Sequence, residues 1–338
     1  LLGRFLSNVW LKLKSMMQIT KKTAKMWSRM GPRAVYGRVM SAIAKENENV
    51  LLISADLGRS SGLASFYQAH PEQFINAGIA EQNMIGVAAG LTRLNYDVFA
   101  STFAPFASMR ASEQVRMNMG YMEEPVKLIA LGSGVSMAFL GNSHFGLEDV
   151  AVMKTIPGLT IISPADCIEL YKVMHASLKY NHPVYIRLTG AVNCPIVYEE
   201  DYDYIIGKPN WILPKSNINV FATGTTVGHA KKAIEKLNSE GYSIGLLNIH
   251  TIKPLDDDMI SNILVDTKQL FIFEEHSAVG GLKASIYDVL LEKNIRDINV
   301  VAHTLPNEFL ETGEYEYLLN LYHLDAVGIE TKIKENVL

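Results

Sequence analysis

Short, mainly apolar runs that do not alternate with polar residues recur along this chain, and segments with helical spacing separate them. Strands buried on both faces have this pattern, because helices cover both sides of the sheet that they form. The pattern therefore predicts an α/β fold with mostly parallel sheets flanked by helices. The expected strands of the first unit are 50–54, 98–101, 126–131, 160–163 and 184–188, and its expected helices are 33–45, 79–94, 103–119 and 167–179.

A segment rich in Tyr, Asp, Pro and Gly, Pro195–Pro214, interrupts this pattern. A second α/β unit follows, and a chain of 338 residues is long enough for two domains. We expect residues 31–195 and 216–338 to form consecutive domains joined by a linker at 196–215. The expected strands of the second unit are 218–222, 243–249 and 269–274, and its expected helices are 228–239, 254–265 and 281–292.

Residues 1–30 form a basic segment ahead of the first predicted domain. No acidic residue precedes Glu46 in the sequence. Apolar residues such as Leu2, Phe5 and Val9 recur with helical spacing, which makes the segment amphipathic and cationic. This pattern is compatible with attachment to a membrane surface. The interpretation that we favour is an extension or leader ahead of the domain.

Composition and motifs exclude several classes of protein. The net charge of −4 argues against a nucleic-acid binder, and no apolar run is long enough to form a transmembrane helix. Two cysteines are too few for a disulfide framework, which favours a reducing, cytoplasmic setting. The phosphate loops G-x-G-x-x-G and G-x-x-x-x-G-K-[ST] do not occur, which argues against the common nucleotide-binding enzymes.

A glutamate at the start of a predicted helix stands out among the polar residues. Glu81 lies in the stretch Asn76-Ala-Gly-Ile-Ala-Glu-Gln-Asn-Met84, where the apolar spacing of the predicted helix 79–94 begins. From this pattern alone, a carboxylate that pairs with the helix dipole is more typical than a catalytic one.

Three motifs give this glutamate a context. Ile53-Ser-Ala-Asp-Leu57 is followed by Ala77-Gly-Ile-Ala-Glu-Gln-Asn-Met84 and then by Ser101-Thr-Phe-Ala-Pro-Phe106. Their order and spacing resemble the pyrimidine-binding domain of transketolases, which are thiamine diphosphate enzymes. Asn142-Ser-His144 continues the resemblance, and the second unit resembles the family's C-terminal domain around Glu274-Glu-His276. The resemblance covers about residues 33–330.

The resemblance implies a role for each matching residue. Glu81 is implied to bond to the pyrimidine ring of the cofactor and so to promote loss of the proton at its C2 carbon. His144 is implied to contact a substrate oxygen. Phe103 and Phe106 are implied to pack against the pyrimidine ring, since ring burial and offset stacking are favourable. The other implied positions are Asp56 and Leu57 in the cofactor pocket, and Arg33 and Ser60 on the side of the substrate phosphate.

The motif that holds the diphosphate in this family is missing. No Gly-Asp-Gly occurs in the sequence. We therefore expect the C-terminal subunit of a split, two-subunit transketolase-like enzyme. An N-terminal partner subunit would bind the diphosphate of thiamine diphosphate and its Mg²⁺, and this chain would hold no metal. Because the family places its cofactors at interfaces between chains, we expect self-association into a heterotetramer.

Three family positions near the substrate lack their usual polar residues. Ala138-Phe139-Leu140 replaces a Gly-Glu-Asp sequence, Gly132 replaces a histidine, and Gly190 replaces an arginine. A site without that arginine and histidine holds a phosphate less well. We expect transfer of a two-carbon ketol unit from a ketose donor to an aldehyde acceptor that is not an ordinary pentose phosphate.

Two alternatives remain open on the sequence. The β-type subunit of a 2-oxo acid decarboxylating or dehydrogenase component is also split and also keeps the glutamate. Its donor would be a 2-oxo acid such as pyruvate rather than a ketose. A non-catalytic relative with a scaffolding or regulatory role is the second alternative. It is favoured by the altered substrate segment 138–140 and disfavoured by the presence of Glu81.

Overall fold

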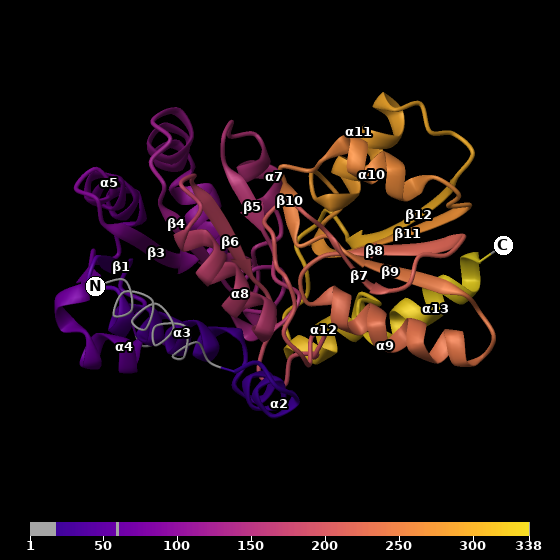
Figure 1. The fold of residues 1–338 in the computed structure, drawn as a ribbon, viewed down its shortest axis with the longest axis horizontal. Coiled ribbons are helices and arrows are strands. Elements are labelled where there is room, and N and C mark those ends of the chain that lie inside the picture. Colours follow the sequence, from indigo (N-terminus) through magenta and orange to yellow (C-terminus); the bar gives the residue numbers. More distant parts are fainter. Residues whose placement is uncertain (1–17, 59–60, 338) are drawn as a thin grey trace, which may run out of the picture.

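A computed structural model describes residues 18–58 and 61–337, which form two α/β domains lying side by side (Figure 1). Each domain has a mostly parallel sheet flanked by helices, which confirms the predicted fold class. The amphipathic pattern of residues 2–17 lies outside the described residues. Among the helices that the structure describes, none is both long enough and apolar enough to cross a membrane.

The first sheet has seven strands in the order β10-β5-β6-β4-β3-β1-β2. β1 to β6 are parallel, and every residue of β1, β4 and β6 is buried, as expected for a sheet covered on both faces. β10 comes from the second half of the chain and runs antiparallel to β5 at the sheet edge. The bounds are β1 (Val50–Ser54), β2 (Phe74–Asn76), β3 (Asp97–Phe103), β4 (Lys127–Leu131), β5 (Thr160–Ile162), β6 (Val184–Leu188) and β10 (Thr251–Lys253).

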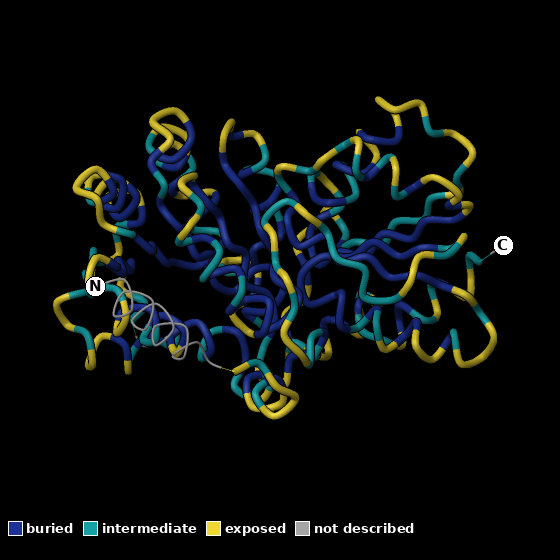
Figure 2. Tube along the Cα trace, in the orientation of Figure 1, coloured by how far each residue is buried: buried dark blue, intermediate teal, exposed yellow. Residues whose placement is uncertain are grey.

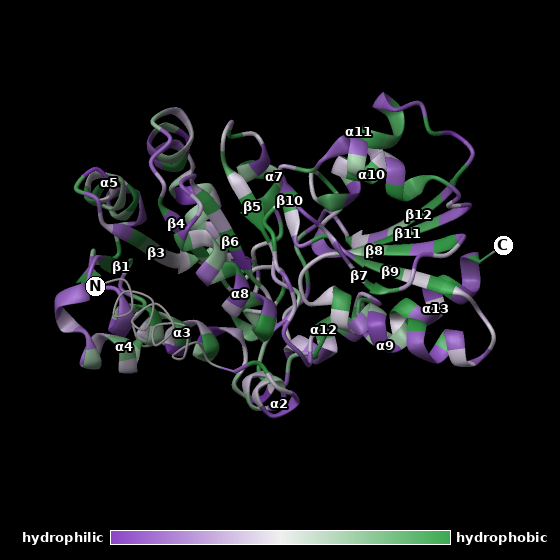
Figure 3. Cartoon of the chain, in the orientation of Figure 1, coloured by the Kyte–Doolittle hydropathy of each residue, from purple (hydrophilic) through white to green (hydrophobic). Residues whose placement is uncertain are grey.

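Helices cover both faces of this sheet. α3 and α8 pack in one apolar cluster with Leu52 and Phe99, whereas α5 and α7 pack in another with Ile53 and Ala100. Successive strand residues point to opposite faces, so each strand contributes to both clusters. The strands are accordingly dark blue in Figure 2 and mainly green in Figure 3. The bounds are α3 (Pro32–Glu46), α4 (Ala64–Ala69), α5 (Glu81–Thr92), α7 (Asp149–Lys154) and α8 (Cys167–Leu178).

The segment 103–119 was predicted as one helix, and this prediction was wrong in detail. β3 continues to Phe103, which pairs with Leu131, so helical structure begins only after this residue. The turns Phe106–Arg110 and Val115–Tyr121 are π-helical and flank the short α6 (Ser112–Gln114). π-helical turns are frequent at functional sites, and Phe106 is one of the predicted site residues.

The second sheet has the strand order β12-β11-β8-β9-β7, with β7 antiparallel to β9 and the other pairs parallel. β7 lies within the predicted linker 196–215, so part of that segment is an edge strand. Figure 1 shows α10 and α11 on one side of the sheet and α9, α12 and α13 on the other. The bounds are β7 (Asn210–Leu213), β8 (Ile218–Ala222), β9 (Ile244–Asn248), β11 (Gln269–Ser277), β12 (Asn299–Leu305), α9 (Thr226–Ser239), α10 (Asp257–Leu264), α11 (Leu282–Glu292), α12 (Tyr315–Leu321) and α13 (Ala326–Asn336).

One helix was not predicted, because its residues fell within the expected basic extension 1–30. α2 (Lys21–Met30) begins at the N-cap Thr20, whose hydroxyl accepts a hydrogen bond from the Thr23 N–H group. Trp27 on α2 is fully buried and lies 5.6 Å from Tyr171 of α8, measured between ring centroids. Residues 21–30 are therefore part of the folded first domain rather than an extension ahead of it.

Candidate functional site

The predicted site residues gather at one edge of the first sheet. Phe103 ends β3, the segment carrying His144 follows β4, and Asp56 follows β1. Neighbouring parallel strands end at the same edge of a sheet, so these loops lie beside one another, and ligands of open α/β sheets bind at this edge. Glu81 joins them because α5 begins after β2, which pairs with β1.

Glu81 is the first residue of α5, and only 3 % of its surface is exposed. The start of a helix favours a carboxylate because its N–H groups are unpaired and the helix dipole is positive there. The Oε1 atom of Glu81 accepts a hydrogen bond of 2.8 Å from Nη1 of Arg110. This buried carboxylate is thus placed to hold or share a proton with a ligand nitrogen.

Phe103, Phe106 and His144 form an aromatic cluster at the same edge. Their rings pack edge to face, with centroids 6.0 Å apart for the two phenylalanines. The His144 ring lies 5.6 Å from Phe103 and 5.3 Å from Phe106. The Nδ1 atom of His144 is 2.9 Å from the Ser143 hydroxyl, so Nε2 is the ring nitrogen left for a substrate.

Arg110 connects this cluster to the glutamate, and the sequence analysis missed it. Its guanidinium carbon lies 3.9 Å from the centroid of the Phe106 ring, while the same group pairs with Glu81. Cations are attracted to aromatic faces in this arrangement. The signal that was available is the spacing of four residues between Phe106 and Arg110 in a segment expected to be helical, which places them on one face.

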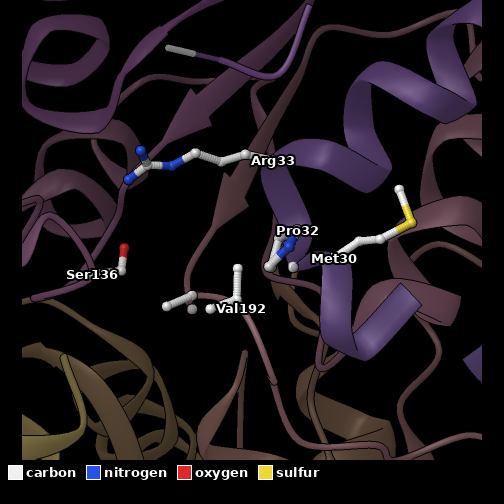
Figure 4. Close-up of a pocket in the computed structure, with 8 residues that line it drawn as sticks. Met30, Pro32, Arg33, Ser136 and Val192 are labelled. Atoms are coloured by element: carbon white, nitrogen blue, oxygen red, sulfur yellow. The ribbon is translucent and has the colours of Figure 1, made fainter. Parts of the chain in front are cut away.

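Arg33 lies at the start of α3, next to a cavity of about 240 Å³. Its Nη2 atom is 2.7 Å from the Met137 sulfur, and its guanidinium carbon is 5.9 Å from the Phe103 ring centroid. Burial lowers the pKa of Arg33 below its usual value. Figure 4 shows its side chain extending towards the side of the cavity where Ser136 lies. The cavity is lined by Met30, Gly31, Pro32, Arg33, Ser136, Gly190, Ala191 and Val192.

The remaining predicted residues are less closely connected to this cluster. Asp56 is exposed and has φ +56°, and its carboxylate accepts a hydrogen bond of 3.0 Å from the Asn76 amide. Leu57 is partly buried and packs against the core at the end of β1. Ser60 lies outside the described residues.

The cluster has the groups that an aminopyrimidine ring requires. Glu81 offers a buried carboxylate for a ring nitrogen, and the two phenylalanines offer aromatic surfaces for the ring itself. Within residues 18–58 and 61–337, no three His, Cys, Asp or Glu side chains come together as a metal site.

Comparison with known families matches two parts of the chain. Residues 29–191 match the family described as "Transketolase, pyrimidine binding domain", and residues 207–329 match "Transketolase, C-terminal domain". The chain belongs to the transketolase family. The resemblance read from the sequence is thereby confirmed, and the two matched parts correspond to the two sheets of the structure.

Three relatives show which kind of transketolase this is. A putative transketolase C-terminal section of Methanocaldococcus jannaschii is 34% identical, over 91% of this chain and 96% of that protein. One of the subunits of an apulose-4-phosphate transketolase of Phocaeicola vulgatus is 32% identical, over 85% and 91%. A 6-deoxy-6-sulfo-D-fructose transketolase subunit of a Clostridium species is 31% identical, over 88% and 91%.

A solved structure agrees with these relatives. It is described as a split gene transketolase, an inactive β4 tetramer, with 31% identity and a TM-score of 0.80 over 90% of this chain and 97% of that one. The relatives that this chain spans almost completely are single sections or subunits of split transketolases. The chain is therefore a C-terminal subunit of a transketolase-like enzyme.

Proposed function

We propose that this subunit works with an N-terminal, diphosphate-binding subunit to transfer a two-carbon ketol unit from a ketose donor to an aldehyde acceptor in carbohydrate metabolism. In this proposal residues 31–195 bind the aminopyrimidine ring of thiamine diphosphate, and residues 216–338 form the C-terminal domain beyond the linker 196–215. The absence of Gly-Asp-Gly from the sequence supports a partner that holds the diphosphate and Mg²⁺. A heterotetramer of two copies of each subunit is the proposed assembly.

Each side chain of the cluster has a role in this proposal. When bound, thiamine diphosphate supplies the carbon nucleophile that carries the two-carbon unit. Glu81 holds a proton in a hydrogen bond to the pyrimidine ring nitrogen, which its burial keeps from exchanging freely with water. Phe103 and Phe106 pack against the ring, with Asp56 and Leu57 at the pocket wall. His144 donates a hydrogen bond to the substrate oxygen where negative charge develops.

The observation that carries this function is the buried carboxylate of Glu81 beside the aromatic pair. A Glu81→Gln variant keeps the size of the side chain but cannot ionise. In the complex with the partner subunit, we expect its turnover with a ketose donor to fall by about 100-fold or more. Exchange of the cofactor C2 proton with deuterium, followed by NMR, should slow in parallel.

The control is Glu48→Gln, which changes an exposed carboxylate of the same domain. Both variants should elute with the partner in size-exclusion chromatography as the unaltered chain does. Turnover by Glu81→Gln equal to that of Glu48→Gln would refute the proposed role. Loss of assembly in Glu81→Gln alone would show instead that the carboxylate is structural.

The cavity beside Arg33 supports an acceptor other than an ordinary pentose phosphate. Arg33 is the charged residue of a lining that also contains Met30, Pro32 and Val192, and Gly190 stands where the family's arginine is expected. Phe139 is 70% exposed in the segment that lost its acidic residue. Two of the relatives are named for uncommon sugars, apulose 4-phosphate and a sulfonated deoxyfructose.

An acceptor panel tests this substrate class. We expect comparable rates with ribose 5-phosphate and with neutral aldehydes, whereas strong and exclusive use of ribose 5-phosphate would contradict the proposal. Arg33→Met should raise KM for anionic acceptors by about tenfold or more, with little effect on neutral aldehydes, because one charge-assisted contact is lost. Arg38→Met, which changes an exposed arginine of the same helix, is the matched control.

Donor use separates this proposal from the alternatives. A ketose donor is expected, and decarboxylation of pyruvate would indicate the β-type subunit of a 2-oxo acid component instead. Activity with neither donor in the presence of the partner would indicate a non-catalytic relative. Cys167 and Cys194 are free thiols, which supports the proposed cytoplasmic setting.

A further inference from the structure

The segment that carries His144 contacts both domains. We call residues 132–146, which follow β4, the substrate loop. Its two ends meet, since Gly134 and Gly146 exchange backbone hydrogen bonds of 2.8 and 3.0 Å. Its middle and its first turn touch residues of the C-terminal domain. We propose that the C-terminal domain positions the His144 ring through two side chains, Asn142 and Glu275, and this inference rests on the proposed role of His144 in the reaction.

Asn142 fixes the middle of the loop to the segment that follows β12. Its amide nitrogen donates to the Leu310 carbonyl at 2.7 Å, and its amide oxygen accepts from the Leu310 N–H group at 2.8 Å. One side chain thus satisfies both polar groups of a residue that is only 4 % exposed. Two residues later, the His144 N–H group donates to the Gly141 carbonyl at 2.8 Å, which ties the histidine to this anchor.

Gly141 shows how closely the two segments approach. It has φ +64°, and a Cβ atom at this position would lie 2.4 Å from the methyl group of Thr312. A side chain would therefore push the substrate loop away from the C-terminal domain. The close contact and the paired hydrogen bonds together fix the height of the loop above the sheet.

Glu275 on β11 holds the first turn of the loop. Its Oε1 atom accepts the Val135 N–H group at 2.8 Å, and a Cβ at Gly134 would lie 2.1 Å from the same oxygen. Its Oε2 atom accepts hydrogen bonds from Tyr315 at 2.7 Å and Thr225 at 3.1 Å. The carboxylate is therefore fixed from the C-terminal domain before it reaches the loop.

Arg187 links this anchor to the far end of the loop. Its Nη2 atom donates to the Gly146 carbonyl at 3.1 Å and to the Glu275 backbone carbonyl at 2.8 Å. Both ends of the loop and its middle are consequently referred to the C-terminal domain. The His144 ring is left in one orientation between Phe103 and Phe106. Small displacements matter at such a place, because about 1 Å of misplacement costs roughly 100-fold in rate.

The first test needs neither partner nor substrate. With histidine labelled at ¹³Cε1, the resonance of His144 in the full-length subunit is shifted by the ring currents of Phe103 and Phe106, and His144→Ala assigns it. We expect Asn142→Ala to move this resonance towards that of a free imidazole. Asn142→Asp, which keeps the acceptor for the Leu310 N–H group, should restore part of the shift.

Ser285→Ala is the matched control. It removes a contact between the domains that does not involve the loop, the 2.6 Å hydrogen bond from Lys154 to the Ser285 hydroxyl. The His144 resonance should stay in place in this variant. An unchanged resonance in Asn142→Ala, or an equal movement in Ser285→Ala, would overturn the proposal. Asn142 is at the surface, so this arm remains informative even if Glu275→Gln fails to fold.

The second test uses the two-subunit complex with xylulose 5-phosphate as donor. Asn142→Ala should lower kcat/KM by about tenfold, and in the His144→Ala background it should have no further effect. Independent, multiplying effects of the two changes would refute positioning through His144. If His144→Ala keeps full activity while Asn142→Ala still moves the resonance, the proposed function of His144 fails and the positioning stands.

Discussion

Replacing Trp27 by alanine tests whether α2 is an integral part of the first domain. The indole is fully buried against Tyr171, and the Trp27 carbonyl accepts the Gly31 N–H group at 2.9 Å where α2 turns into α3. Truncation of a buried aromatic side chain to alanine costs about 3–5 kcal/mol of unfolding free energy. For a domain of this size that corresponds to a fall of about 6–20 °C in Tm.

The assay is thermal and urea unfolding of the subunit, followed by circular dichroism. Met26→Ala is the control, because Met26 lies beside Trp27 on the same helix but is 42% exposed. Since Met30 and Gly31 line the cavity beside Arg33, we also expect Trp27→Ala to weaken binding of anionic acceptors. A loss below about 1 kcal/mol, equal to that of Met26→Ala, would refute the conclusion that α2 belongs to the folded domain.

Three further predictions follow from buried groups elsewhere. Burial lowers the pKa of His250 from 6.5 to about 4, so its protonation favours the unfolded chain. The free energy of unfolding should therefore fall by up to about 3 kcal/mol as the pH drops from 6.5 to 4, and His250→Phe should flatten this dependence in urea titrations. Asp149→Ala leaves the buried Arg187 without its carboxylate and should cost about 3–5 kcal/mol, whereas the double variant with Arg187→Met should recover part of this loss. The hydrogen bond to Cys194, together with burial, raises the pKa of Cys167, so alkylation at pH 8 should be far slower than in urea, and equal rates would contradict this.

The elements that the sequence predicted well are those whose patterns depend on burial alone. Val50–Ser54 and Val184–Leu188 are apolar on both faces and were placed with their observed bounds. β12 (Asn299–Leu305) was missed because it is an edge strand whose residues are mostly half-buried, which leaves no continuous apolar run. α2 was missed because its many basic residues conceal a single buried tryptophan.

The candidate site was predictable to the extent that its residues share sequence motifs. Glu81, Phe103, Phe106 and His144 come together as expected from their positions at strand and helix ends. Arg110 and Glu275 could not be found in the same way. Their roles depend on which segments meet in space, and Glu275 lies 140 residues from the loop residue that it contacts.

The short strand β10 has a consequence for how such enzymes can be altered. Thr251–Lys253 belongs to the C-terminal half of the chain but completes the sheet of the N-terminal half. A C-terminal domain exchanged between relatives would carry this strand with it, and a poor match would leave the edge of β5 with unpaired N–H and C=O groups open to aggregation. The two domains are therefore inherited as one unit, and recombination of transketolase sections should succeed at the border between subunits rather than within this one.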